Sequence, residues 1–221
     1  MKLLLIRHAE SEGNRQHRLQ GRKDFPLTQL GRDQSAALAR RVAAASPAAV
    51  YASPLLRAME TAQTVATIAG LDVIPEPRVQ EYDFGPTLSG LTWPEIRAQR
   101  PQLGTTPGDN PGNFPSYPGE EGRETFRERV SEAFSEIISR HAADDAVAVV
   151  THAGPIVVFL MDVLHREYSR PIPFSLDNAS ITTVEVNPKG LPGAPPMVVA
   201  GLNDTCHLHG LISSDCAEGS A

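Results

Sequence analysis

Residues 1–11 read MKLLLIRHAES, and this stretch sets the pattern from which the fold class can be predicted. Leu3–Ile6 is an apolar run with the length of a short strand that is buried on both faces. Arg7 and His8 follow at once, so the strand ends in a fixed cation and an imidazole. Chain reversals are more often built from Gly, Asn or Asp. The Arg-His pair therefore indicates chemistry at the carboxyl end of this strand.

The same arrangement, an apolar run followed by polar residues, occurs twice more along the chain. Residues 48–52 (AAVYA) precede Ser53, and Ala146–Thr151 (AVAVVT) precedes His152. Segments with apolar residues at helical spacing separate these runs. The expected strands are 3–6, 48–52, 71–75, 146–151, 180–186 and 196–203, and the expected helices are 28–46, 53–70, 91–100, 123–142 and 155–166.

Two of these helices carry clear start signals. Thr28 is expected to be an N-cap, and Ser53 is expected to be another, with Pro54 at the first helical position. Strands that alternate with helices predict an α/β fold in which a mostly parallel sheet is covered on both faces. We therefore expect a three-layer α/β/α sandwich.

A stretch rich in Pro and Gly, residues 101–122, could join two domains or form one long loop. We favour a loop, because neither side of it holds a complete set of elements. This makes residues 1–212 a single domain, followed by a tail at 213–221 that is expected to be disordered. The loop is equally well explained as a lid over a site or as a plain surface excursion.

The overall composition excludes several classes of protein. The 221 residues carry a formal net charge of -6, which argues against a general nucleic-acid or acidic-membrane binder. No apolar run approaches the length of a membrane span, and Arg7 follows Leu3–Ile6 too early for a signal peptide. Cys206 and Cys216 form no disulfide framework. These features predict a cytoplasmic protein with reduced thiols.

Ligands of such sheets bind outside the carboxyl ends of the strands. His8, Ser53 and His152 each follow a predicted strand, and Arg57 lies in the first turn of the helix after Ser53. A helix starts directly after His152, and free N–H groups at a helix start attract anions. Arginine guanidinium groups match phosphate oxygens. The sequence therefore predicts a cleft for a phosphate dianion.

Histidine is the nucleophile that this sequence supports. There is no Walker-type phosphate loop, C-x5-R loop or evident Ser-His-Asp set, and a neutral imidazole can attack phosphorus. We expect the arginines to disfavour protonation of His8. Glu81 is the candidate general acid, and Glu10 or Asp83 could take its place. Cys206, His207 and His209 lack a second ligand pair upstream, so no metal site is expected.

Six segments, taken together and in order, resemble the motifs of the histidine phosphatase superfamily, which has the phosphoglycerate mutase-like fold. They are RHAESEGN (7–14), QGRKDFPLTQLGRDQ (20–34), SPLLRAMETA (53–62), EYDFG (81–85), VVTHAG (149–154) and LNDTCHL (202–208). Each match alone is weak, but the ordered set spans almost the whole chain and is specific.

The resemblance implies a role for individual residues. His8 is the nucleophile that forms a phosphohistidine, and Glu81 acts first as acid and then as base. Arg7, Arg57 and His152 bind the phosphoryl group. The implied substrate-binding residues are Ser11, Asn14, Gln20, Gly21 and Ala153, with Asn14 and the Ala153 N–H as secondary phosphate contacts and Gln20 and Gly21 at the pocket rim. No metal ion or organic cofactor is implied.

The sequence departs from the family pattern mainly outside the core catalytic groups. Ala9 and Ala153 replace glycines, PTLSG follows the acid, and GEEG stands where G-E-S is frequent. The short interval from Glu81 to His152 favours hydrolysis over a cofactor-dependent phosphoglycerate mutase. A non-catalytic phosphate-binding module is the other alternative. The expected partner is a small phosphomonoester, and pairing through an exposed edge strand could form a homodimer.

Overall fold

A computed structural model of the protein describes residues 1–101, 118–166, 174–187 and 195–211. Its sheet has six strands in the order β3-β2-β4-β1-β5-β6. The first four strands in this order pair in parallel, whereas β5 is antiparallel to both β1 and β6. The predicted, mostly parallel sheet is thus confirmed. The strands are β1 Lys2–Arg7, β2 Ala49–Ala52, β3 Val73–Pro75, β4 Ala146–Thr151, β5 Ile181–Val186 and β6 Met197–Asp204.

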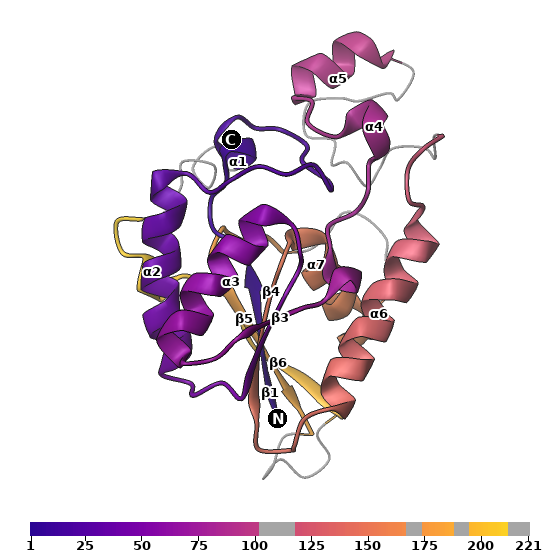
Figure 1. Ribbon diagram of the computed structural model, residues 1–221. Helices are drawn as coiled ribbons and strands as arrows, with labels where there is room; N and C mark the ends of the chain where they lie inside the picture. The colour runs from indigo at the N-terminus through magenta and orange to yellow at the C-terminus, as the bar shows by residue number, and fades with distance from the viewer. Residues whose placement is uncertain (102–117, 167–173, 188–194, 212–221) are drawn as a thin grey trace.

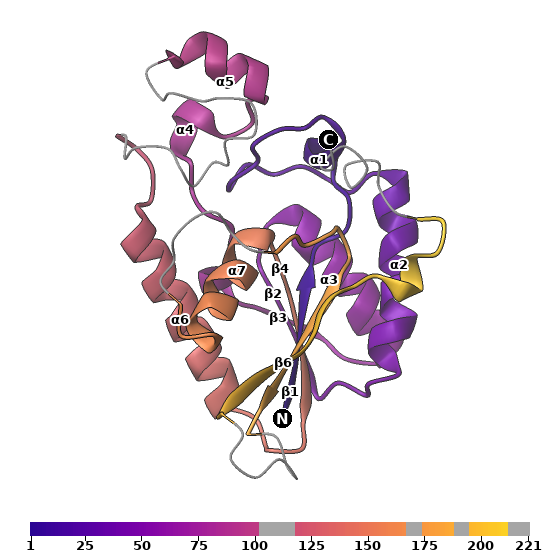
Figure 2. The ribbon, with the colours of Figure 1, turned by 180° about the vertical axis from the view of Figure 1, so that it is seen from behind.

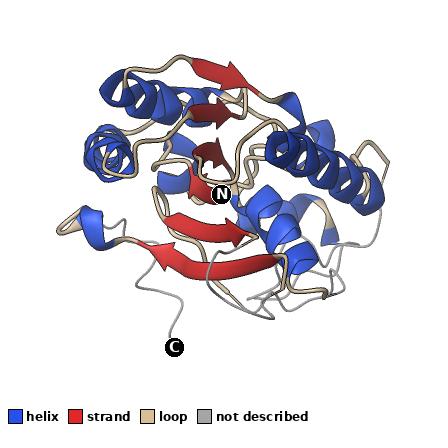
Figure 3. Ribbon diagram, turned by 90° about the horizontal axis from the view of Figure 1, so that it is seen from below, coloured by secondary structure: helices blue, strands red, loops and turns tan. Residues whose placement is uncertain are grey.

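Helices cover both faces of the sheet, as the view from below in Figure 3 shows. The alternation of β1 explains this arrangement, because successive side chains point to opposite faces. Leu3 and Leu5 belong to the core under α6 and α7, whereas Leu4 and Ile6 belong to the core under α2 and α3. A strand with both faces buried needs the continuous apolar run found here. These helices span α2 Gln29–Ala43, α3 Leu56–Ala69, α6 Arg123–Ser139 and α7 Ala153–Val163.

The two predicted helix starts have different outcomes. Thr28 is an N-cap whose hydroxyl accepts the Gly31 N–H at 2.9 Å. Ser53 is not an N-cap, because α3 begins at Leu56, two positions later than expected. The Ser53 hydroxyl instead accepts the Leu55 N–H at 3.3 Å and contacts a side chain of another strand end, which bends the chain before the helix can start.

Several short elements lie outside the helices and strands expected from the sequence. The short helices at residues 12–15, 85–88 and 93–99 lie beyond the carboxyl end of β1, at the top of Figure 1. Figure 2 shows the same end from behind, with α2 and α3 on one side and α6 and α7 on the other. These elements are α1 Glu12–Arg15, η1 Pro77–Val79, α4 Gly85–Leu88 and η4 Cys206–Leu208, and the expected helix at 91–100 is α5 Trp93–Gln99.

Two expectations fall mainly on undescribed segments. Residues 102–117 of the predicted loop and the predicted tail lie outside the described residues. Within the described parts, no helix has both the length and the apolar character that crossing a membrane requires.

Candidate active site

The carboxyl ends of three neighbouring strands bring the predicted site residues together. Arg7 is paired with Thr151 across β1 and β4, and the His8 N–H donates to the Thr151 carbonyl at 2.9 Å. The rings of His8 and His152, one residue beyond each strand, therefore lie with their centroids 5.1 Å apart. Ser53 follows β2, the next strand along. The strand register thus places two buried imidazoles and a serine at one point.

Hydrogen bonds fix the tautomer of His8. Its Nδ1 lies 2.7 Å from the Ala9 carbonyl oxygen, which can only accept, so Nδ1 carries the proton. Its Nε2 accepts from Nε of Arg57 at 3.2 Å. The lone pair on Nε2 therefore faces a guanidinium in the buried site. This is the state that a nucleophilic imidazole requires.

Arg57 is held rigidly although it is charged. Its side chain is 1% exposed, and its two terminal nitrogens donate to the carbonyls of Lys23 (3.1 Å) and Gly21 (2.8 Å). Burial lowers the pKa of Arg57 to about 10, which still leaves it protonated at neutral pH. Arg7 adds a second cation, anchored by a hydrogen bond from Nη1 to the Leu176 carbonyl.

Both imidazoles are held neutral. Burial, followed by the charges of Arg57 and Arg7, lowers the pKa of His8 well below its usual value of 6.5. Burial and the same cations also lower the pKa of His152. The sequence predicted the effect of the arginines, but burial is the larger cause. The site is therefore cationic through its arginines while both histidines are uncharged.

Ser53 is the hydrogen-bond partner of His152. Its Oγ lies 2.8 Å from Nε2 of His152 and already accepts the Leu55 N–H. A serine hydroxyl can donate one hydrogen bond and accept two, so this contact alone permits either tautomer of His152. We expect the hydroxyl to donate to Nε2, which leaves the imidazole proton on Nδ1. Nδ1 is buried and has no hydrogen-bond partner among the described residues. It is the donor available to a phosphoryl oxygen.

The side chain of Glu81 lies against the N-terminal end of α7, which follows His152 in the chain. Its Oε1 accepts the Tyr82 N–H at 2.9 Å, and its Oε2 accepts the Gly154 N–H at 3.2 Å. The alternative carboxylates are engaged elsewhere. Glu10 accepts from the Thr28 hydroxyl at 2.6 Å, and Asp83 accepts the Gly85 N–H at 2.8 Å. This arrangement favours Glu81 as the acid, next to Ala153 at the first position of α7.

The residues implied as substrate contacts form a layer beside His8. Asn14 accepts through Oδ1 from the Ser11 N–H at 3.2 Å and from Nδ2 of Asn178 at 3.3 Å, which fixes the orientation of its amide. Gln20 is buried against Ser11, with 2.8 Å between Oε1 and Oγ, and so does not stand at an exposed rim. Gly21 contributes the carbonyl that accepts a hydrogen bond from Nη2 of Arg57.

Two supporting residues were missed from the sequence. Thr61 accepts the Ala9 N–H at 3.1 Å and donates to the Arg57 carbonyl at 2.7 Å. Its position four residues after Arg57, on the same helix face, was the available signal. Asn178 donates to the His8 carbonyl at 3.0 Å, and it comes from a distant segment that no local pattern marks.

One group among the described residues has the spacing of metal ligands, namely Asp204, Cys206 and His207. It lies at the carboxyl end of β6, whose last residue is Asp204, and includes none of the predicted phosphate-binding residues. The Arg41 guanidinium donates to Oδ2 of Asp204 at 3.2 Å, so this carboxylate already has a cationic partner. The expectation that the active site uses no metal stays a prediction.

Comparisons with known proteins show similarity over almost the whole chain. Phosphoserine phosphatase 1 of Hydrogenobacter thermophilus is 32% identical over 208 residues, which are 94% of this chain and 94% of that protein. The structure of YhfR from Bacillus stearothermophilus has a TM-score of 0.79 at 29% identity, over 94% of this chain and 98% of that chain. A histidine-to-alanine variant of Entamoeba histolytica phosphoserine phosphatase, in complex with phosphoserine, has a TM-score of 0.72 at 26% identity, over 94% and 98% of the two chains.

A family model provides the most direct assignment. The model of the histidine phosphatase superfamily (branch 1) matches residues 3–192, a span that contains every residue of the site described above. The chain therefore belongs to the histidine phosphatase superfamily.

Proposed function

We propose that this protein is a metal-independent phosphomonoester hydrolase that works through a phosphohistidine on His8. The observation that carries the proposal is the hydrogen bond from Nε of Arg57 to Nε2 of His8 at 3.2 Å. It keeps the lone pair of the buried imidazole unprotonated and places a cation where the phosphoryl charge would develop. A site that only binds phosphate does not need such a nucleophile.

The residues define a two-step reaction. Arg7, Arg57 and the Nδ1–H of His152 hold the phosphoryl oxygens while Nε2 of His8 attacks phosphorus. The P–O bond to the alcohol breaks, and Glu81 supplies the proton that the leaving oxygen takes. Glu81 then removes a proton from water, which attacks the phosphohistidine and releases inorganic phosphate. The arginines spread the charge of the transferring group in both steps.

The substrate is proposed to be a small phosphorylated metabolite, with phosphoserine as the first candidate. Support comes from the phosphoserine phosphatase of Hydrogenobacter thermophilus, which aligns with almost the whole chain. The solved phosphoserine complex of the Entamoeba histolytica enzyme has the same fold and a similar length. Phosphoserine is an alkyl phosphate, so its alkoxide leaving group needs the acid that Glu81 provides.

Phosphate release from a panel of phosphomonoesters in the presence of a chelator tests this function. Phosphoserine, phosphothreonine, 3-phosphoglycerate and p-nitrophenyl phosphate make a suitable panel, with the His8→Ala variant as control. We expect chelator-resistant release, and an acid-labile phosphoprotein in rapidly quenched samples, both absent from His8→Ala. Circular dichroism of His8→Ala should show the native fold.

Other results of this experiment would point to the alternatives. Interconversion of phosphoglycerates that depends on a bisphosphorylated primer would indicate a mutase. Tight binding of vanadate without release from any ester would indicate a phosphate-binding module.

A further inference from the structure

Arg129 on α6 contacts the chain segment that carries Glu81. Its Nη1 donates to the carbonyls of Arg78 at 2.6 Å and Gln80 at 2.8 Å, and its Nη2 donates to the carbonyl of Glu81 at 3.0 Å. Residues 80–84 have no regular secondary structure, so their carbonyls have no strand or helix partners. One guanidinium therefore fixes the main chain on the N-terminal side of the acid.

Glu121 completes the coordination of Arg129. The Arg129 Nη2 donates to Oε2 of Glu121 at 2.9 Å, and its Nε donates to Oε1. Arg129 thus uses all five of its N–H donors, three on carbonyls and two on one carboxylate. The two side chains are only 13% and 7% exposed, so solvent screens the pair weakly. The guanidinium also lies over the Phe126 ring, 4.8 Å from its centroid.

Glu121 extends these contacts to the main chain on the C-terminal side of Glu81. Its Oε2 accepts the Asp83 N–H at 3.2 Å, and its own N–H donates to the Asp83 carbonyl at 3.0 Å. Its Oε1 accepts from Nη2 of Arg22 at 2.8 Å. Arg129 and Glu121 therefore hold the main chain on both sides of Glu81.

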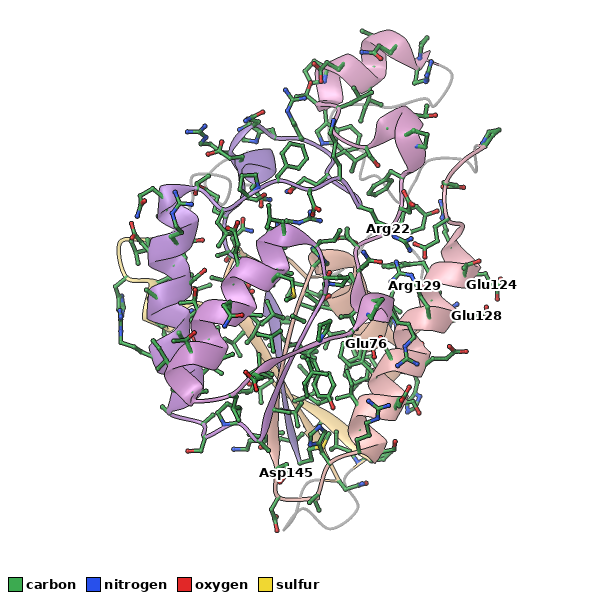
Figure 4. All side chains as sticks on the ribbon, viewed as in Figure 1. Arg22, Glu76, Glu124, Glu128, Arg129 and Asp145 are labelled. Atoms are coloured by element: carbon green, nitrogen blue, oxygen red, sulfur yellow. The ribbon has the colours of Figure 1, made fainter. Side chains whose placement is uncertain are left out.

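The charged side chains around α6 lie on different sides of the helix (Figure 4). Figure 4 shows Arg129 and Arg22 toward the inner side of α6, whereas Glu124 and Glu128 lie on its outer side. An arginine is required for the five contacts, because lysine has only three donors and no planar fork. A salt bridge that only stabilised α6 would not need hydrogen bonds to the main-chain carbonyls at and before Glu81.

We propose that Arg129, together with Glu121, is a positioning residue for the general acid Glu81. This inference rests on the proposed phosphatase function. Arg129 touches neither the nucleophile nor a phosphate-binding side chain through any of its five donated hydrogen bonds. Its effect is on the delivery of a proton to the leaving oxygen.

A leaving-group comparison separates this role from a general structural one. We would measure kcat and KM of Arg129→Lys and Glu121→Gln on phosphoserine and on p-nitrophenyl phosphate. Nitrophenolate leaves without a proton, whereas the serine alkoxide does not. The comparison uses kcat/KM, which reports the phosphorylation step and not the later attack of water, where Glu81 is the base for both esters. We expect kcat/KM on phosphoserine to fall by about 10- to 100-fold, since general acid catalysis contributes roughly 10²–10⁴, and kcat/KM on the aryl ester to stay within about twofold.

A double-variant comparison gives a second readout. In a Glu81→Gln background the acid is already absent, so Arg129→Lys should cause no further loss on phosphoserine. Arg78→Gln is the matched control. The Arg78 side chain also joins η1 to α6, through Glu136 at 2.6 Å, and it pairs with the neighbouring Glu76 at 2.7 Å. These hydrogen bonds reach neither the Gln80 nor the Glu81 carbonyl. The Arg78→Gln substitution should change neither ester's kcat/KM by more than about twofold.

Two results would overturn the inference. One is an equal loss in kcat/KM on both esters in a folded variant, and the other is an unchanged kcat/KM on phosphoserine. If Arg129→Lys does not fold, the same comparison on Glu121→Gln decides. Absence of phosphate release by the wild-type protein would instead refute the proposed function.

Discussion

The N–H of Gly154 donates to Oε2 of Glu81 at 3.2 Å, and the space beside it leaves no room for a side chain. A Cβ at residue 154 would come closer than 3.0 Å to Oε1 of Glu81 and to 3.1 Å from Cζ of Phe126. The carboxylate is the end of a flexible side chain, so it would move before the main chain does. Because Gly154 has no side chain, the Glu81 carboxylate can occupy its position beside the start of α7.

Gly154→Ala should therefore displace the acid while the fold persists. We expect kcat/KM on phosphoserine to fall by about tenfold or more, because an acid moved by about 1 Å loses its alignment with the leaving oxygen. The kcat/KM of the aryl ester, which reports phosphorylation of His8 without need of an acid, should stay near the wild-type value. Steady-state kinetics on both esters and a melting curve provide the check. Full activity on phosphoserine would show that Glu81 needs no such space.

Ser53→Ala should disturb His152 without removing any charged group. With the hydroxyl gone, Nε2 of His152 loses its donor, and the imidazole proton is no longer confined to Nδ1. We expect vanadate to bind about tenfold more weakly, which corresponds to about 1.4 kcal/mol. Nitrogen-15 chemical shifts of His152 would identify the tautomer, and Ser53→Thr, which keeps the hydroxyl, is the control. Observation of the Nε2–H tautomer in the wild-type protein would contradict the assignment.

The buried histidines should make stability depend on pH in a defined direction. In the folded state the pKa values of His8 and His152 are lowered, whereas in the unfolded chain they are near 6.5. Below pH 6.5 the unfolded chain therefore binds protons that the folded protein does not. The free energy of unfolding should be level above pH 6.5 and fall below it by about 1.4 kcal/mol per pH unit for each histidine.

Urea unfolding between pH 5 and 7.5 measures this slope. The variants His8→Gln and His152→Gln should each reduce the slope of unfolding free energy against pH by the contribution of one histidine. The contributions of the carboxylates should be the same in all three proteins. Identical slopes in the variants and the wild type would contradict the lowered pKa values.

Thr61→Val should destabilise the protein although it preserves the size of the side chain. The Thr61 hydroxyl lies between the Ala9 N–H and the Arg57 carbonyl in a fully buried position. Valine leaves the buried Ala9 N–H unpaired, which costs about 1–3 kcal/mol of unfolding free energy. Thr61→Ser keeps the hydroxyl and should lose less. Denaturant melts of the two variants test the difference, and the reverse order would show that the methyl group matters more.

The layers of the fold could be predicted because they follow from local patterns. A continuous apolar run such as Leu3–Ile6 fits only a strand covered on both faces, and Ala146–Thr151 repeats the pattern beside it. The convergence of His8, His152 and Arg57 followed from the rule that parallel strands end at one edge.

Contacts between distant segments could not be predicted in the same way. Ser53 has the residue type of an N-cap, but a contact with His152 from another strand overrides that local preference. Asn178 and Arg129 donate hydrogen bonds to main-chain carbonyls. Every residue has a carbonyl, so the sequence does not indicate which ones are bound. The short helices α1 and α4, four residues each, are below the length at which periodicity is informative.

The position of β1 in the sheet has a consequence for biosynthesis. Its partners are β4 and β5, both of which lie in the later part of the chain. A ribosome that adds roughly 5–20 residues per second needs on the order of ten seconds to reach Ala146 after completing Arg7. During that time the apolar run Leu3–Ile6 is outside the sheet that later buries it. A nascent chain that ends before β4 therefore displays an unpaired, aggregation-prone strand, the kind of segment that molecular chaperones bind.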